Sequence, residues 1–154
     1  MNKETFPGML PNGGHFLIDS LPHAQSIGMK VLEMARAKAT VMVPYAEHLI
    51  GDPETGVIHG GVVTSLLDNA SGLAAFLAFD EPKSIATLDL RIDYNRPAQP
   101  GRDLIATTYC HKVTRSVAFI RGTAYDESID DPVATSVAVF MITAHTRAMQ
   151  GETK

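Results

Sequence analysis

The segment GVIHGGVVTSLLDNASGLAAF, residues 56–76, holds two adjacent glycines and one carboxylate that could act together on a carbonyl group. Gly60 and Gly61 follow His59 and come directly before a helical apolar pattern. The first N–H groups of a helix have no intrahelical acceptor, and the helix dipole adds partial positive charge there. Such a helix end is suited to polarising a carbonyl and to holding the oxyanion that forms when it is attacked. The alternative is that the two glycines only let a loop turn tightly into the helix.

Asp68 is the one charged side chain of this segment after Gly61. On a helical wheel it points away from the apolar stripe, which is the usual position of a solvated surface residue. A solvated face would surround Asp68 with Lys, Glu, Gln or Arg, but the residues on its side are all small and uncharged: Thr64, Ser65, Ser71, Gly72 and Ala75. We therefore predict that Asp68 lies in a cleft or interface, where a retained carboxylate is usually functional.

The spacing of the glycines and the carboxylate indicates a site shared by two chains. Gly60 and Asp68 are eight residues apart, which is about 12 Å along a helix. That distance is too long for both groups of one chain to reach one small reacting group. Two such helices running antiparallel across a two-fold axis would place Gly60 of one chain opposite Asp68 of the other, and this would form two sites per dimer.

One long helix must position these groups, and its apolar stripe is continuous: Val62, Val63, Leu66, Leu67, Ala70, Leu73, Ala74 and Leu77. Before it, we expect a short helix over residues 15–26 bounded by Pro22, strands at 29–34 and 37–43, and a long loop at 45–58.

After the helix the apolar period changes to two. In SIATLDLRIDYNRP the even positions Ala86, Leu88, Leu90, Ile92 and Tyr94 are predicted to face the core, and the odd positions Thr87, Asp89, Arg91 and Asp93 to face outward. Three further strands follow at 104–113, 117–125 and 133–145. The pattern predicts an α+β fold in which an antiparallel sheet wraps one long helix.

The composition limits the class of protein. With 154 residues the chain fits one domain, for which we expect an arm at 1–14, a core at 15–147 and a tail at 148–154. A net charge of −4 without a Lys/Arg cluster argues against nucleic-acid binding. The single cysteine, Cys110, excludes an internal disulfide, and no metal site is expected. The chain shows neither a secretory leader nor a membrane-length apolar run, so a cytoplasmic location is expected.

Three features together resemble one family: His59-Gly60-Gly61, Asp68 nine positions after the histidine, and the strand TLDLRIDY at 87–94, ending in Asn95-Arg96-Pro97. From about residue 15 onward the chain resembles the hotdog-fold acyl-CoA thioesterases, in their phenylacetate-pathway (PaaI-like) branch. This resemblance implies a five- or six-stranded antiparallel sheet around one central helix. It also implies homodimers paired edge to edge, commonly homotetramers, with acyl-CoA sites at the subunit boundary and no cofactor beyond the coenzyme A of the substrate.

The resemblance also implies roles for individual residues. Gly60 N–H would polarise the thioester carbonyl, Asp68 would act as general base or nucleophile, and Thr87 would position the water. Apart from the resemblance, we expect His59 to orient either the glycine turn or the Asp52 loop through hydrogen bonds. The family usually carries an asparagine in the preceding loop, and Asp52 is the nearest residue here. We expect the substrate to contact the remaining small or polar positions of the helix: Gly61, Val62, Thr64, Ser65, Asn69, Ser71 and Gly72.

Two other functions stay open. The first is a hydratase or dehydratase of the same fold, which resembles a D-x-N-P-[LIV]-H loop that the sequence GDPETGVIH does not reproduce. The second is a non-catalytic acyl-CoA-binding protein. The floor of an acyl pocket is expected from Phe76, Leu77 and Phe79, and aryl, short and medium chains all remain open. His48, His111 and Cys110 are expected to be structural.

Overall fold

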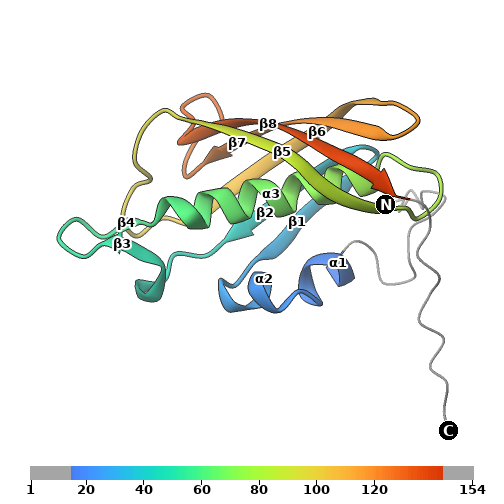
Figure 1. The fold of residues 1–154 in the computed structure, drawn as a ribbon. Coiled ribbons are helices and arrows are strands. Elements are labelled where there is room, and N and C mark those ends of the chain that lie inside the picture. Colours follow the sequence, from blue (N-terminus) through green and yellow to red (C-terminus); the bar gives the residue numbers. More distant parts are fainter. Residues whose placement is uncertain (1–14, 144–154) are drawn as a thin grey trace, which may run out of the picture.

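The computed structural model describes residues 15–143, in which a curved antiparallel sheet wraps around one long helix (Figure 1). The elements are α1 (His15–Asp19), α2 (Pro22–Ser26), β1 (Lys30–Ala35), β2 (Lys38–Val43), η1 (Glu47–Leu49), β3 (Ile50–Asp52), β4 (Val57–Ile58), α3 (Gly60–Phe76), β5 (Ser84–Tyr94), β6 (Leu104–Val113), β7 (Val117–Tyr125) and β8 (Ala134–Thr143). The order in the large sheet is β1-β2-β6-β7-β8-β5. The predicted hotdog arrangement, an antiparallel sheet of five or six strands around one long helix, is confirmed with six strands. The predicted arm and tail lie outside the described residues.

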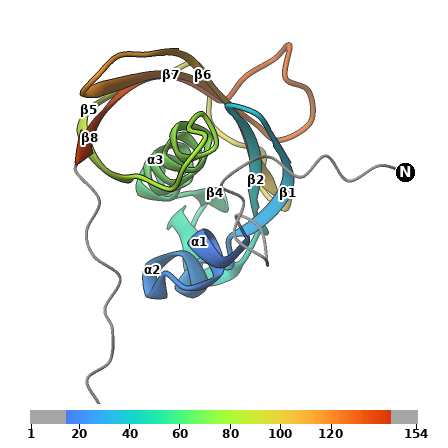
Figure 2. The ribbon, with the colours of Figure 1, turned by 90° about the vertical axis from the view of Figure 1, so that its right-hand side faces the viewer.

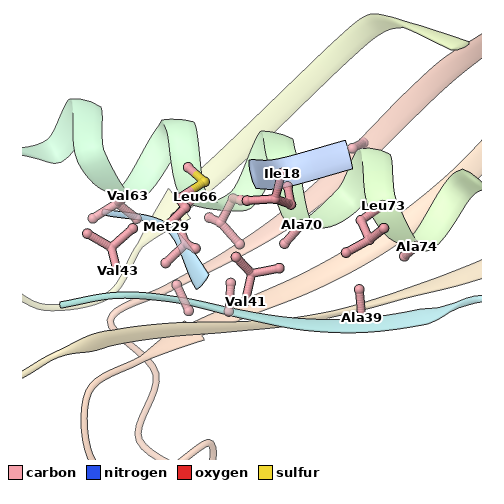
Figure 3. Packing of buried hydrophobic residues seen from close by; sticks show 14 of the residues in the cluster. Ile18, Met29, Ala39, Val41, Val43, Val63, Leu66, Ala70, Leu73 and Ala74 are labelled. Atoms are coloured by element: carbon pink, nitrogen blue, oxygen red, sulfur yellow. The ribbon is translucent and has the colours of Figure 1, made fainter. Parts of the chain in front are cut away.

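The core lies between α3 and the concave face of the sheet. In the end-on view of Figure 2, the sheet curves around α3 while α1 and α2 lie on the other side of the helix. Figure 3 shows Val63, Leu66 and Leu73 of α3 beside the alternate residues Val41 and Val43 of β2. Leu66, Val41 and Val43 are completely buried. The apolar stripe of the helix thus packs as its periodicity predicts. No helix among residues 15–143 is long and apolar enough to cross a membrane.

The prediction that Ser71 and Ala75 lie on the open side of α3 is wrong, because both are completely buried. The helix contacts five strands of the curved sheet, β2, β5, β6, β7 and β8. A curved sheet covers a wider arc of a helix than a flat one, so it also encloses the residues beside the apolar stripe. The open face of α3 is consequently narrower than the helical wheel predicts.

A β-bulge in β5 overturns half of the predicted facing pattern. The ladder with β8 pairs Thr87 with Phe140 and Asp89 with Val139, which leaves Leu88 as an extra residue. A one-residue insertion moves the following side chains to the opposite face. Leu90 and Ile92 pack against the core as predicted. Leu88 is instead 56% exposed, Ala86 is also exposed, and Thr87, predicted to face outward, reaches a side chain of α3.

Residues 45–58 were expected to form a loop, but they contain η1 and a small antiparallel pair, β3 and β4. Leu49 of η1 and Ile58 of β4 are buried. The backbone N–H of His59 donates to the Leu49 carbonyl at 2.9 Å. Strands of three and two residues are too short to show a periodic pattern, yet this pair fixes the point at which α3 begins.

An ion pair closes one end of the large sheet. The guanidinium of Arg96, which follows β5, donates to both carboxylate oxygens of Asp126, which follows β7, at 2.9 and 2.7 Å. The Gln99 backbone N–H donates to the same carboxylate at 2.7 Å. The side chain of Asp126 is completely buried. The hydrogen bonds from Arg96 are the main cause that lowers the pKa of Asp126 to about 2.

This pair predicts an acid-sensitive contribution to stability. Asp126→Asn is expected to lower the free energy of unfolding by about 3 kcal/mol at pH 7, because it removes the buried charge partner of Arg96 and leaves the guanidinium only the exposed carboxylate of Asp131. A carboxyl whose folded pKa is depressed contributes stability above its unfolded pKa and loses it as the pH falls through the folded pKa. The difference in free energy of unfolding between the wild-type chain and the variant should therefore decrease by about 2 kcal/mol as the pH falls from 6 to 2. Urea unfolding across this range measures it, and a constant gap would contradict the assignment.

Candidate active site

His59 caps the start of α3 with its own ring. Its backbone is extended, with φ −60° and ψ 135°, and its Nδ1 accepts the Gly61 N–H at 2.9 Å. The ring is therefore unprotonated at Nδ1 and carries its proton on Nε2. A Cβ on residue 61 would lie 2.9 Å from this Nδ1 atom, which is too close. Glycine at position 61 thus permits the cap. The Gly61 N–H is hydrogen-bonded to His59 and is not available to a ligand.

Gly60 presents the first N–H of the helix, and this group has no hydrogen-bond acceptor among residues 15–143. The Gly60 carbonyl is held by two hydroxyl groups. Tyr94 Oη donates to it at 2.9 Å and Thr64 Oγ1 at 3.2 Å. The two hydroxyls are also 3.1 Å apart. Tyr94 thus fixes the first turn of α3 against the end of β5 and leaves the Gly60 N–H free.

The sequence interpretation assigned Tyr94 to the core and missed this contact. Tyr94 lies on the same face of β5 as Leu90 and Ile92, and the residue is 52% exposed. A tyrosine at the end of an otherwise aliphatic face was the available signal, because its hydroxyl needs a polar partner.

The structure brings Asp68 and Thr87 together. The Thr87 hydroxyl donates to one carboxylate oxygen of Asp68 at 2.9 Å. Asp68 comes from the middle of α3 and is partly buried, whereas Thr87 comes from the edge strand β5. The contact depends on the bulge at Leu88, since Thr87 would follow the outward-facing set without it. The hydrogen bond fixes the orientation of the carboxylate and leaves its second oxygen available.

Asp68 also lines a cavity of about 580 Å³. Asn69 and Gly72, both expected to contact substrate, line it too, as does Phe76. Leu77 and Phe79 are not among its lining residues and are buried in the core. Of the three residues expected at the floor of an acyl pocket, only Phe76 lines this cavity. The Asp68 carboxylate therefore lies in the wall of a mostly apolar cavity.

The other positions expected to contact substrate lie elsewhere. Val62 and Ser71 are buried in the core. Ser65 Oγ is 2.9 Å from His23 Nε2, and Ser65 does not line the 580 Å³ cavity. Gly61 and Ser65 line a second cavity, of about 510 Å³, together with three histidines: His23, His48 and His59. Within the described part of the chain, no three His, Cys, Asp or Glu side chains are grouped so that they could hold a metal ion.

Asp52 is exposed and makes its hydrogen bonds within its own turn. One carboxylate oxygen accepts the Thr55 hydroxyl at 2.6 Å and the other accepts the Glu54 N–H at 3.1 Å. The hydrogen bond from Thr55 is the main cause that lowers the pKa of Asp52 below its ordinary value. The structure thus places this carboxylate in the β3–β4 turn and gives it no hydrogen bond to Gly60 or Asp68.

Comparison with known proteins identifies the family of this chain. The family model described as the thioesterase superfamily matches residues 55–133, which include α3 and β5. A Halobacterium salinarum protein is 35% identical over 94 residues, covering 59% of this chain and 61% of that relative. The Escherichia coli medium/long-chain acyl-CoA thioesterase YigI is 25% identical over 142 residues, covering 84% of this chain and 90% of that relative.

Solved structures with the same fold span most of the chain. A Pseudomonas aeruginosa protein superposes with a TM-score of 0.76 at 37% identity, covering 83% of this chain and 95% of that one. A mutant of the phenylacetic acid degradation protein PaaI from Thermus thermophilus superposes with a TM-score of 0.69 at 26% identity, covering 79% and 98%. The chain therefore belongs to the thioesterase superfamily, and it is a hotdog-fold thioester hydrolase.

Proposed function

We propose that this chain hydrolyses acyl-CoA thioesters at two equivalent sites that form across a dimer interface. One observation carries the proposal. The Asp68 carboxylate is oriented by Thr87 on the wall of an apolar cavity, whereas the free N–H of Gly60 lies eight residues earlier on the same helix. At about 12 Å along the helix, these two groups complement each other only between two chains.

The edge strand β5 supports such a dimer. It is 11 residues long and lies at the end of the sheet order, where it pairs with β8 within residues 15–143. A long edge strand is a template for pairing with another chain. Two copies paired through antiparallel β5 strands would continue the sheet and would bring their α3 helices antiparallel to each other. Each Gly60 would then face the partner's Asp68.

The reaction at each site would follow from these two groups. The thioester carbonyl oxygen would accept the Gly60 N–H of one protomer, which stabilises the oxyanion as the carbonyl is attacked. Asp68 of the other protomer would either remove a proton from the attacking water or attack directly to form a mixed anhydride, which water then opens. In both routes the C–S bond breaks, and the coenzyme A thiolate leaves and takes up a proton.

Thiol release from a panel of acyl-CoA esters tests the proposed function. We expect the wild-type protein to release free thiol from at least one of acetyl-, hexanoyl-, decanoyl- and phenylacetyl-CoA. A fall in enoyl absorbance with crotonyl-CoA, without thiol release, would instead identify a hydratase. Binding of a non-hydrolysable S-alkyl-CoA without any thiol release would identify a binding protein.

Thr87 provides a prediction about positioning. Thr87→Val removes the hydroxyl that orients Asp68 and keeps a β-branched side chain of similar size. We expect kcat to fall about tenfold, because a hydrogen bond to a charged group is lost. Thr87→Ser retains the hydroxyl and should remain much closer to wild type. Steady-state kinetics of both variants decide this, and equal kcat values for Val and Ser would contradict the role of the hydroxyl.

A further inference from the structure

We propose that the 580 Å³ cavity along the C-terminal half of α3 is the acyl pocket, and that it accepts straight acyl chains of up to about ten carbons. This inference rests on the proposed acyl-CoA hydrolysis and names its substrate class. The cavity, its lining residues and the glycine in its wall carry the argument.

One wall of the cavity is a single stripe of α3. Its members recur at helical spacing from the carboxylate toward the end of the helix: Asp68, Asn69, Gly72, Leu73 and Phe76. Asp68 and Phe76 are eight residues apart, so the stripe is about 12 Å long. A thioester whose carbonyl lies at Asp68 would therefore direct its acyl chain along the stripe toward Phe76.

The facing walls are apolar and come from two separate parts of the fold. The helix α1 supplies Leu17 and Ile18, the link to α2 supplies Leu21, and the sheet supplies Ile85 and Phe140. Lys83, directly before β5, is the one cation among the lining residues from the described part of the chain. Its ammonium group lies 5.3 Å from the ring centroid of Phe79. An alkyl chain matches these walls, because it buries apolar surface and leaves no polar group without a partner.

The length of the stripe sets the length of the chain. With C–C bonds of about 1.52 Å and angles near 111°, an extended alkyl chain advances about 1.25 Å per carbon. About ten carbons therefore span the 12 Å between Asp68 and Phe76. A phenylacetyl group would fill only about half of this length.

Gly72 lies halfway along the stripe and keeps the channel open. A Cβ at this position would meet Phe140 Cε1 at 3.5 Å and Ile85 Cδ1 at 3.9 Å, which are ordinary contacts. Alanine thus fits, whereas the longer side chain of leucine would extend into the cavity. Gly72 is four residues from Asp68, or about 6 Å, which corresponds to about five carbons.

The experiment compares kcat/KM for decanoyl-CoA and butyryl-CoA in matched variants. Gly72→Leu is expected to lower the decanoyl-to-butyryl ratio at least tenfold, because each excluded methylene is worth about fourfold in binding. Gly72→Ala is the matched control for the loss of glycine, and Leu and Ala are both good helix formers. Leu32→Ala, at a side chain 52% exposed on β1, controls for unrelated changes and should keep the wild-type ratio. Phe76→Ala should extend the range toward chains longer than ten carbons.

A binding measurement distinguishes failure of the pocket assignment from failure of the proposed acyl-CoA hydrolysis. S-decyl-CoA is a thioether that cannot be hydrolysed, and it should raise the melting temperature of wild type more than S-ethyl-CoA does. Gly72→Leu should abolish this difference. If wild type cleaves acyl-CoA but Gly72→Leu keeps its decanoyl preference and its response to S-decyl-CoA, the pocket assignment is overturned. If wild type releases no thiol from any acyl-CoA, the proposed function fails, and this inference fails with it.

Discussion

Replacing Asp68 with asparagine is expected to lower kcat for acyl-CoA hydrolysis at least about 100-fold, because general-base help contributes about 10²–10⁴-fold. Asparagine has nearly the same shape as aspartate, and its carbonyl oxygen can still accept the Thr87 hydroxyl. The variant should therefore keep its fold while losing the basic and nucleophilic oxygen. A thiol-release assay at saturating substrate measures the effect.

A matched control is available on β5, the strand that carries Thr87. Asp89 is an exposed carboxylate on β5 beyond the bulge, and Asp89→Asn should leave kcat close to the wild-type value. Thermal unfolding of both variants should stay within about 2 °C of wild type. If Asp68→Asn retained full turnover with an intact fold, the carboxylate would have no part in the chemistry.

Replacing Gly60 with proline is expected to lower kcat about 10²–10³-fold, the usual effect of losing one oxyanion donor. Proline has no N–H, and it is well tolerated as the first residue of a helix, where its fixed φ fits. His59, the preceding residue, has ψ 135°, which is the extended conformation favoured before proline. The substitution therefore removes the one donor that the mechanism needs, with little effect on α3.

Gly60→Ala is the control for this change, because it keeps the N–H. A Cβ at this position would lie 3.6 Å from Tyr94 Oη, an ordinary contact. We expect Gly60→Ala to turn over at least about tenfold faster than Gly60→Pro, since only the latter loses the oxyanion donor. Steady-state kinetics with one acyl-CoA compare them, and equally slow alanine and proline variants would point to crowding at Tyr94 instead.

The sequence predicts the architecture well because the relevant patterns are long. The apolar stripe of α3 and the alternation in β6, β7 and β8 each extend over about ten residues or more. Shorter elements do not show a pattern from which their structure can be predicted. The hairpin of β3 and β4 has too few residues for a period, and the bulge at Leu88 reverses the facing of part of β5 through one inserted residue. A bulge depends on pairing with β8, so alternation along one strand does not reveal it.

The candidate site is predictable in its residue types and less so in its contacts. Asp68, Gly60 and Thr87 stand out through spacing and family resemblance. The sequence does not show that the His59 ring takes up the Gly61 N–H or that Tyr94 holds the Gly60 carbonyl. Both contacts depend on side-chain orientation at the junction of α3 with other elements. The Arg96–Asp126 pair likewise joins residues 30 positions apart.

The central claim, that each site takes Gly60 from one chain and Asp68 from its mate, is tested most directly by mixing two defective chains. Asp68→Asn and Gly60→Pro chains, co-expressed with different tags and purified as the mixed dimer, would retain one site in which both groups are intact. We predict about half of the wild-type turnover per dimer, although each parent dimer is nearly inactive. A mixed dimer no more active than its two parents would contradict the shared site.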